Sequence, residues 1–309
     1  MADVLIVAKS NSYGLTRDMA LFKAELEAIG KSVETASPRG RQFLDRLSRR
    51  KRAKTVVHME RAFPQWYSAG ERNWLIPNQE RFPKRQLGRL AGIDLVLAKS
   101  RHGEAVFAAR SVATEFLGFI SEDRRSRDIG KEWSRFFHLA GGSAVKGTED
   151  VIGLWTKHPE WPELVIVQKD KDLATARPSN IRIVSGYLDD AELKQLQNAC
   201  GVHLCPSRSE GWGHHIVEGL SVGAVLVTTD APPMNEHVTP ETGVTVAHAR
   251  CEPRHLGTNF FVDPVALETA ISNLVRMDDA SKAKLGAAAR ERYETMIVGF
   301  RQRLAALPW

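Results

Sequence analysis

The chain has 309 residues, a formal net charge of +6 and 43% hydrophobic residues. This length exceeds the size at which a single hydrophobic core usually stops growing, so we expect two domains. The balance of apolar and charged residues is that of a folded globular protein, which excludes a disordered chain, a collagen-like repeat and a disulfide-framed scaffold.

The charge is unevenly distributed along the chain. Residues 1–120 hold 21 basic and 12 acidic side chains, whereas residues 121–309 hold 22 basic and 25 acidic side chains. We therefore expect the first part, with a net charge of +9 from these counts, to attract an anionic partner.

The sequence also predicts the compartment. Three cysteines without C-x-x-C spacing predict neither a disulfide framework nor a zinc site. The N-terminus does not resemble a signal peptide, and no apolar run reaches the ~18 residues of a membrane span. We expect a cytoplasmic protein, with peripheral binding at the inner membrane face left open.

The first half alternates predicted strands and helices. The apolar run Val4–Ala8 predicts a buried strand, and after a polar loop a helical pattern covers residues 16–29. Further strands are expected at 33–35, 55–58, 74–77 and 93–98, with a helix at 104–110. This order is typical of a parallel α/β sheet.

The alternation restarts after the charged residues 121–132, which we interpret as a linker. The expected strands are 136–140, 164–168, 181–184, 202–205 and 225–228, and the expected helices are 148–157, 190–199, 217–222 and 264–277, before a helical region at 281–307. Two successive β/α units predict two Rossmann-like domains with a cleft between them.

The segment from Pro206 to Gly223 carries the strongest chemical signal. Seven residues separate Glu210 from Glu218, and Gly211 and Gly213 lie between them at the predicted start of a helix. Glycines allow the backbone to approach a ligand and expose N–H donors, while carboxylates accept hydrogen bonds from vicinal hydroxyls. This pattern favours a polyhydroxylated, anionic ligand.

The same segment resembles retaining glycosyltransferases of the GT-B fold, family 4 in particular. The matching pattern is P-S-x-x-E-G-x-G-x-x-x-x-E-G-x-x-x-G, which contains the E-x7-E motif, and the resemblance is good over residues 134–245. It implies an α/β fold of GT-B type, in which two Rossmann-like domains with parallel sheets face a central cleft. We expect domains at 1–125 and 134–280, with the helical region 281–309 packing back on the first.

The resemblance also implies roles for individual residues. Glu218 would hold the ribose of a nucleotide-sugar donor, and Glu210 the transferred sugar. The other candidates for donor binding in these segments are Gly14, Gly186, Tyr187, Leu188, Arg208, Gly211, Trp212, Gly213 and His214.

A second segment, residues 137–148, predicts a strand, a glycine-rich turn and a helix start. Such a turn suits a pyrophosphate, and Lys146 adds a positive charge. It resembles the family's G-R-x-x-x-x-x-K-G element, but Gly142 and Ser143 stand where the arginine is expected. Either Arg208 compensates for that charge or phosphate binding is weaker.

Three residues of the first half are further candidates for catalysis. His58 ends a predicted strand, where an imidazole can contact a sugar hydroxyl or serve the structure alone. Asn78 and Glu80 follow another strand, at a place where the family presents polar residues to the cleft.

Residues 39–54 contain eight basic side chains and one acidic side chain. Phe43, Leu44 and Leu47 have helical spacing, which is compatible with a basic amphipathic helix. A solvated face, an anionic membrane surface and a nucleic-acid backbone all remain open as explanations.

The sequence therefore predicts a metal-independent, retaining glycosyltransferase that uses a nucleotide sugar, with no cofactor and with a glycan or lipid-linked glycan as acceptor. Asp170-Lys171-Asp172 is interpreted as a solvated turn rather than a metal site. The alternatives are a transferase acting on nucleic acid and a non-catalytic nucleotide-sugar-binding protein.

Overall fold

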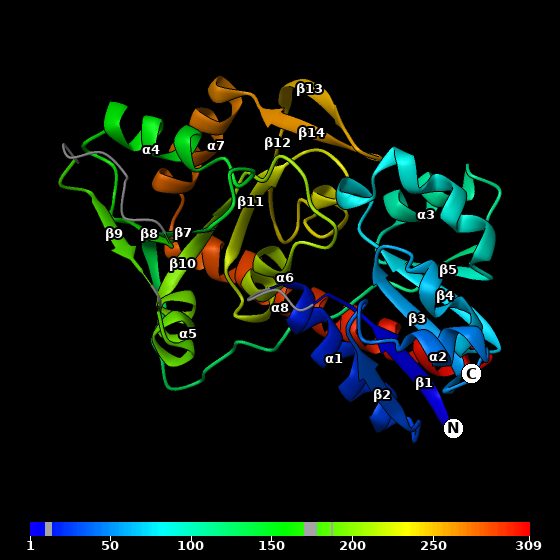
Figure 1. The fold of residues 1–309 in the computed structure, drawn as a ribbon. Coiled ribbons are helices and arrows are strands. Elements are labelled where there is room, and N and C mark those ends of the chain that lie inside the picture. Colours follow the sequence, from blue (N-terminus) through cyan, green and yellow to red (C-terminus); the bar gives the residue numbers. More distant parts are fainter. Residues whose placement is uncertain (10–13, 170–177, 187) are drawn as a thin grey trace. The chain divides into compact units, whose positions relative to one another are not determined.

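The computed structural model describes residues 1–9, 14–169, 178–186 and 188–309 (Figure 1). The chain divides into two compact units. Unit 1 comprises residues 1–120, 253–257 and 296–309, and unit 2 comprises residues 121–252 and 258–295.

Unit 1 is built on a parallel six-stranded sheet of order β2-β1-β3-β4-β5-β6. Its strands are β1 (Ala2–Val7), β2 (Val33–Ala36), β3 (Ala53–Glu60), β4 (Arg72–Pro77), β5 (Leu95–Ala98) and β6 (Thr114–Phe116). The apolar run at the N-terminus forms β1, an interior strand between β2 and β3, which agrees with its burial on both faces.

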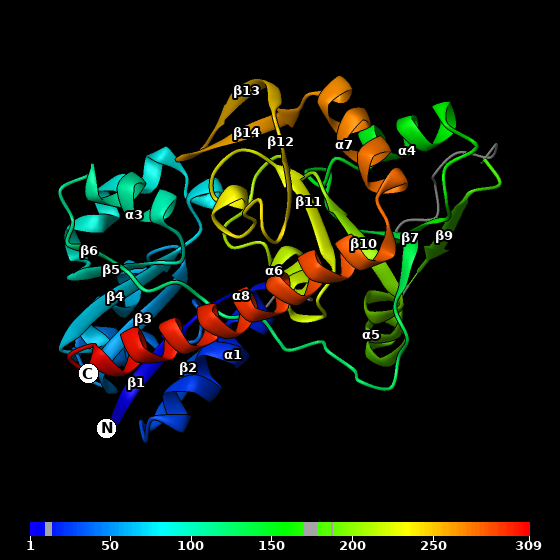
Figure 2. The ribbon, with the colours of Figure 1, turned by 180° about the vertical axis from the view of Figure 1, so that it is seen from behind.

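Both faces of this sheet are covered. On one face, Phe22 of α1 (Gly14–Ala28) lies against Phe119 and Trp309, and Trp309 also contacts Trp74. Figure 2 shows α1 and the C-terminal end of the chain next to this sheet. The opposite face is covered by a cluster of apolar side chains that includes Leu75 and Phe107. The helical elements of this region are η1 (Pro64–Ala69), η2 (Gln79–Arg81), η3 (Lys84–Gly92) and α3 (Arg101–Ala108).

Unit 2 has its own parallel sheet of order β12-β11-β10-β7-β8-β9. Its strands are β7 (Glu132–Gly141), β8 (Leu164–Gln168), β9 (Ile181–Ser185), β10 (Cys200–Cys205), β11 (Val225–Thr229) and β12 (Gly243–Val246). This is the strand order of the Rossmann fold, with the chain reversing direction across the sheet between β7 and β10.

Alternate residues of β7 face opposite sides of the unit 2 sheet. Phe136 joins the cluster formed with α4 (Thr148–Lys157) and α7 (Pro264–Arg276), whereas Phe137 joins the cluster with α5 (Asp190–Ala199). Figure 1 shows α4 and α7 on one side of the sheet and α5 with α6 (His214–Ser221) on the other.

Some elements differ from the sequence expectation. Helix α6 begins three residues earlier than expected, and the hairpin β13 (His248–Arg254) and β14 (Gly257–Val262) was not predicted. The basic segment 39–54 contains one short helix, α2 (Phe43–Leu47), before β3 begins at Ala53. The long C-terminal helix α8 (Asp279–Ala306) contributes residues to both units. Among the described residues, no helix is long and apolar enough to cross a bilayer.

Candidate functional site

The candidate donor site lies where β7 and β10 run side by side in unit 2. These two strands are neighbours in the sheet, and each is followed by a loop that leads into a helix, α4 after β7 and α6 after β10. In doubly wound sheets the ligand binds at this reversal, outside the carboxyl ends of the strands. The two motif segments predicted from the sequence are these two loops.

The two loops contact each other through a backbone hydrogen bond and a close approach of their backbones. Arg208 N–H donates to the carbonyl of Val145 at 2.8 Å. Gly147, in the left-handed region with φ +69°, packs so tightly that a Cβ there would lie 2.4 Å from the Pro206 carbonyl oxygen. A glycine is therefore required at the start of α4 for both its dihedral angle and its close approach.

Lys146 and Glu210 meet at the ends of these loops. Lys146 Nζ lies 2.7 Å from Glu210 Oε1 and 3.1 Å from His215 Nδ1. Because an ammonium group can only donate, Nδ1 of His215 accepts, and its Nε2–H donates to Ser207 Oγ at 3.1 Å. The motif carboxylate and the motif lysine are thus held in one network with a neutral imidazole.

Electrostatics fix the charge states in this network. Burial alone would raise the pKa of Glu210, but the Lys146 charge and the hydrogen bonds from Lys146 and Ser207 outweigh it and lower this pKa to about 2. Burial and the neighbouring Lys146 charge hold the pKa of His215 well below its usual 6.5. At neutral pH the site therefore contains a carboxylate, an ammonium and a neutral imidazole.

His138, on β7, positions the start of α4. Its Nδ1 donates to the Leu204 carbonyl at 2.8 Å, so its Nε2 accepts from the Thr148 hydroxyl at 2.9 Å. Burial lowers the pKa of His138 to about 4, which keeps the ring neutral. The first backbone N–H groups of α4 are thereby fixed in place behind Lys146.

Glu218 is 2% exposed, and a series of side-chain hydrogen bonds holds its carboxylate in place. Its Oε2 accepts from the Gln197 amide at 2.9 Å, and Gln197 Oε1 accepts from Arg124 Nε at 2.9 Å. Arg124 itself is 1% exposed and also donates to Asp190 at 2.5 Å. The guanidinium sets the orientation of the amide, so its N–H₂ group faces the carboxylate.

Sequence reasoning missed Arg124, Gln197, His138 and His215. Arg124 lies in the charged run that we interpreted as a linker, yet the structure buries it in unit 2. For His215 the adjacent pair in the motif was a visible signal, but the sequence alone did not show which histidine points toward Lys146.

The place of the expected arginine is taken by Gly142 and Ser143, which lie in the loop after β7. Arg208 is nearby, but its guanidinium donates to Glu149 and Asp150 of α4, each at 3.3 Å, and to the Ala144 carbonyl at 3.2 Å. Arg208 is thus paired with two carboxylates, and Lys146 is the cation that contacts the motif carboxylate.

The middle of the motif is buried. Gly211, Trp212 and Gly213 are all buried, and Gly213 is left-handed with φ +92° at the N-cap of α6. The indole N–H of Trp212 donates to Ser121 Oγ at 3.1 Å, and His214 Nδ1 lies 2.8 Å from the same hydroxyl. Trp212 and His214 are thereby joined to the first residue of unit 2.

The remaining donor candidates belong to other elements of the chain. Gly186, with φ +99°, follows β9, and Leu188 packs against the apolar cluster of α5. Tyr187 lies outside the described residues. In unit 1, Gly14 is the exposed first residue of α1.

The catalytic candidate His58 is fully buried in unit 1. Its Nδ1 accepts from the Phe63 N–H at 3.3 Å, and its Nε2 donates to Asn73 Oδ1 at 3.2 Å. Burial lowers its pKa to about 4. Both ring nitrogens are engaged within unit 1, which gives His58 a structural part there.

Asn78 and Glu80 flank the start of η2. Asn78 is half-buried, and its carbonyl accepts from Arg81 N–H at 3.0 Å. Glu80 is 7% exposed and pairs with Arg81 at 3.7 Å, while Gly257 packs against its backbone. These two polar residues do follow a strand, β4, at its carboxyl end.

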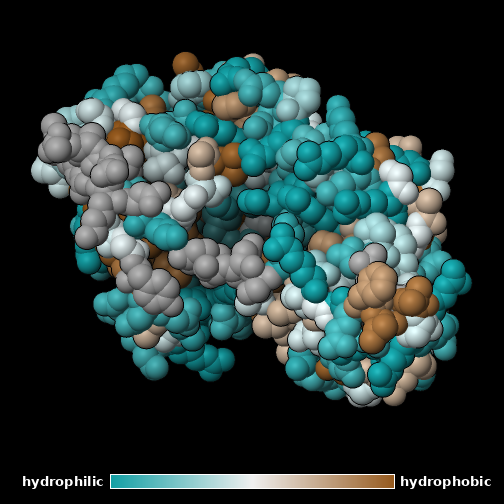
Figure 3. Space-filling model, viewed as in Figure 1, coloured by the Kyte–Doolittle hydropathy of each residue, from teal (hydrophilic) through white to brown (hydrophobic). Residues whose placement is uncertain are grey.

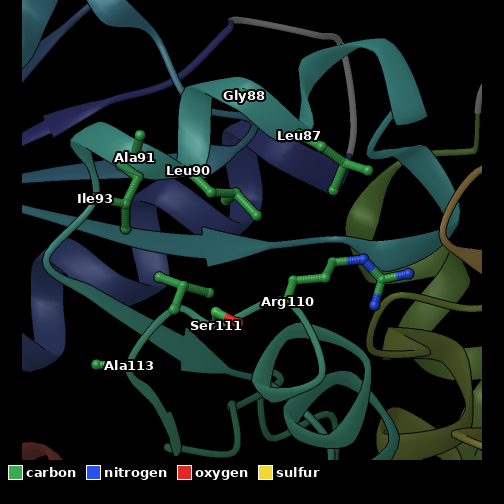
Figure 4. Close-up of a pocket in the computed structure, with 9 residues that line it drawn as sticks. Leu87, Gly88, Leu90, Ala91, Ile93, Arg110, Ser111 and Ala113 are labelled. Atoms are coloured by element: carbon green, nitrogen blue, oxygen red, sulfur yellow. The ribbon is translucent and has the colours of Figure 1, made fainter.

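A surface cavity of about 380 Å³ lies elsewhere in unit 1 (Figure 4). Leu87, Leu90 and Ala91 of η3 line one side, and Arg110 and Ser111 after α3 line the other. None of the candidate donor residues lines it. Asp170-Lys171-Asp172 lies outside the described residues, and elsewhere in the described chain no cluster of three His, Cys, Asp or Glu residues is placed to hold a metal ion.

Part of the chain matches a known protein family. Residues 140–291, about half of the chain, match the family of glycosyl transferases group 1. This segment includes both loops of the site, with Lys146, Glu210 and Glu218. Comparison with curated proteins gave no match.

Solved structures resemble nearly the whole chain. They include Alr3699/HepE of Anabaena in complex with UDP and glucose (TM-score 0.70, 14% identity, 99% of this chain and 98% of that chain). Another is sucrose-phosphate synthase of Thermosynechococcus elongatus (TM-score 0.71, 14% identity, 98% of this chain and 97% of that chain). A third is WaaG, a glycosyltransferase involved in lipopolysaccharide biosynthesis (TM-score 0.68, 15% identity, 98% of this chain and 98% of that chain). The chain therefore has the GT-B fold, and the segment that matches glycosyl transferases group 1 lies in unit 2 except for residues 253–257.

Proposed function

We propose that this chain is a retaining glycosyltransferase that moves a sugar from a nucleotide sugar to an acceptor. The observation that carries the proposal is the Lys146–Glu210 pair of 2.7 Å at the sheet reversal of unit 2. A diphosphate needs a cation and helix N-terminal N–H groups, which Lys146 and the start of α4 supply. A sugar needs hydrogen-bond acceptors, which Glu210 supplies.

In the proposed reaction the bond between the anomeric carbon and the diphosphate oxygen breaks. The acceptor oxygen bonds to that carbon from the same face, through an oxocarbenium-like state, and its proton passes to the departing diphosphate. Lys146 and the N–H groups at the start of α4 stabilise the charge that develops on the leaving group. No step of this proposal needs a metal ion.

The donor proposed for the first test is a uridine nucleotide, because the similar HepE structure was determined with UDP and with UDP-glucose. A thermal-shift panel of nucleoside diphosphates identifies the base, since a ligand that binds the native state raises the melting temperature. Transfer is then assayed with the preferred donor in Glu210→Gln and Glu218→Gln variants. Glu160→Gln, at an exposed carboxylate of unit 2, is the matched control.

We expect both motif variants to lose at least a hundredfold in transfer rate, since each removes a group proposed to bind the donor. The control should retain the parental rate. Undiminished transfer by both motif variants overturns the site. Inversion of the anomeric configuration, read by NMR of the product, overturns the retaining mechanism while leaving the site intact.

A second candidate function is nucleotide-sugar binding without transfer. It is favoured by the Gly142-Ser143 pair at the arginine position and by the pairing of Arg208 with Glu149 and Asp150. It predicts a melting shift with a nucleotide but neither hydrolysis nor transfer with a panel of glycan, lipid-linked glycan and nucleic-acid acceptors. Transfer to any acceptor of the panel excludes it.

A further inference from the structure

Helix α2 of unit 1 turns its apolar side chains to solvent. Phe43, Leu44 and Leu47 are each 72% exposed, and they make up three of the six exposed large hydrophobic residues of the described chain. Figure 3 shows a hydrophobic patch in the region of α2, bordered by hydrophilic surface. A group of exposed apolar side chains rimmed by polar residues marks an interaction surface.

The fold holds α2 in place without using these apolar side chains. Arg41, only 8% exposed, donates to the Gln65 carbonyl at 2.6 Å and to the carbonyls of Asp45 and Arg50 at 3.1 and 3.3 Å. Its guanidinium also lies 5.8 Å from the ring centroid of the buried Trp66. These hydrogen bonds of Arg41 fix the backbone around the apolar side chains, so the fold itself holds the patch in place.

The rim of the patch is basic. Arg39, Arg49, Arg50 and Lys51 are all exposed, and the acidic residue of this segment, Asp45, is half-buried and lies 4.0 Å from Arg50. The surface therefore combines an apolar centre with an excess of positive charge. An anionic bilayer matches both features, since apolar side chains enter the boundary of headgroups and acyl chains while basic side chains pair with lipid phosphates.

Other occupants match only one of the two features. A nucleic-acid backbone would pair with the arginines but would leave Phe43, Leu44 and Leu47 in water. A second copy of this chain would bring an identical basic rim against the first, which costs free energy.

We propose that residues 39–51, with α2 at their centre, bind the surface of an anionic lipid bilayer. This inference goes beyond the proposed function and does not depend on it, because the binding needs neither donor nor acceptor. It also assigns a role to part of the positive charge of residues 1–120, namely pairing with anionic lipids.

The test is sedimentation of the full chain with vesicles made of equal parts phosphatidylcholine and phosphatidylglycerol, without any nucleotide. Vesicles of phosphatidylcholine alone are the second arm. We expect strong binding to the first, weak binding to the second, and weaker binding as salt rises. The triple variant F43S/L44S/L47S should lose at least tenfold in partitioning, and R50Q/K51Q about fivefold for each charge removed.

The chain offers matched controls for both changes. Val265→Ser removes an apolar side chain that is also 72% exposed, but in unit 2, and K84Q/R85Q removes two exposed charges elsewhere in unit 1. Both controls should bind like the parent. Circular dichroism establishes that each variant is folded.

Three results overturn the proposal. The first is unchanged vesicle binding by the α2 variants, and the second is equal binding to neutral vesicles. The third is an absence of binding to the anionic vesicles; retention on DNA, or a dimer that the triple variant dissociates, would then identify the occupant of the patch.

Discussion

Lys146 and Glu210 form an ion pair of 2.7 Å in which the side chains are 17% and 13% exposed. The two residues come from the loops after β7 and β10, which are adjacent strands of one sheet. The sheet therefore holds the two charges together at the place where we propose that the donor binds. Such preorganisation lowers the cost of ordering these side chains when a ligand binds.

Replacing Lys146 with methionine should destabilise unit 2, because Glu210 would keep its burial but lose its counter-charge. We expect the free energy of unfolding to fall by about 3 kcal/mol, as is typical when one partner of a buried pair is removed. Urea unfolding at pH 7 measures this change.

The double variant K146M/E210Q provides the control for this effect. It removes both charges, so its free energy of unfolding should lie closer to that of the parent than that of Lys146→Met does. If the effects of the two single changes simply add, the two side chains do not stabilise each other and the interpretation of the pair is wrong.

Gln197 should act as a positioning residue for Glu218. The Gln197→Leu variant removes the N–H that donates to Glu218 Oε2 at 2.9 Å and leaves Arg124 without its amide acceptor. We expect nucleotide affinity, measured by calorimetry, to fall about tenfold, which corresponds to the ~1.4 kcal/mol of one hydrogen bond to a charged group.

The matched control is Gln195→Leu, the same replacement at an exposed position of the same helix. It should bind nucleotide like the parent. A Gln197→Leu variant that is folded and binds nucleotide with parental affinity would show that Glu218 needs no support from α5.

Two glycines of the first loop and its helix should respond in opposite directions to alanine. Gly147→Ala places a methyl group 2.4 Å from the Pro206 carbonyl oxygen in a left-handed conformation, so we expect a loss of at least ~2 kcal/mol in unfolding free energy. Gly153→Ala, inside α4 with nothing within 4 Å of its Cβ, should stabilise by about 0.5–1 kcal/mol. Urea unfolding measures the free energy of unfolding of both variants. A Gly153→Ala variant that is less stable than the parent would contradict the open space around Gly153.

The strand and helix order of both units could be predicted because most of the strands are short apolar runs separated by polar loops. Val4–Ala8 predicted a strand buried on both faces, since such burial removes any alternation of apolar and polar residues. The hairpin of β13 and β14 was missed because its residues are mostly exposed or half-buried and show no apolar face. The spacing of Phe43, Leu44 and Leu47 was compatible with a helix, and α2 spans these residues, but a periodicity does not tell where a helix ends.

Some residues of the candidate site could be predicted from the sequence and others could not. Lys146, Glu210 and Glu218 could be found because they sit in glycine-containing segments with a readable spacing. Arg124 and Gln197 could not, because their contacts with each other and with Glu218 join residues more than 20 positions apart, and polar side chains in a charged run or on a helix have no pattern that signals burial. Whether a polar residue is buried is decided by the fold as a whole.

Neutral buried histidines should make the protein sensitive to acid. Burial lowers the pKa of His58, His138 and His237 to about 4 and that of His203 to about 3, from a usual 6.5. At a pH between the lowered pKa and 6.5, each of these histidines binds a proton in the unfolded chain but not in the folded chain. The free energy of unfolding therefore rises with pH in this range and falls as the pH drops below 6.5. Each such histidine contributes a slope of at most ~1.4 kcal/mol per pH unit.

The contribution of a single imidazole can be isolated at His237, whose Nε2 lies 2.6 Å from the Trp212 carbonyl. His237→Gln keeps a donor but cannot titrate, so the loss of unfolding free energy between pH 6.5 and pH 4 should be about 3 kcal/mol smaller than in the parent. His158→Gln is the control of opposite sign: hydrogen bonds to Glu268 and Glu160 raise the pKa of His158, so its stabilisation is present below pH 6.5 and lost above the raised pKa. Its removal should therefore leave the slope between pH 6.5 and pH 4 nearly unchanged, because the contribution of His158 varies with pH only above this range. Urea unfolding across this pH range measures both slopes, and a parental slope in His237→Gln would mean that this ring is protonated in the folded state.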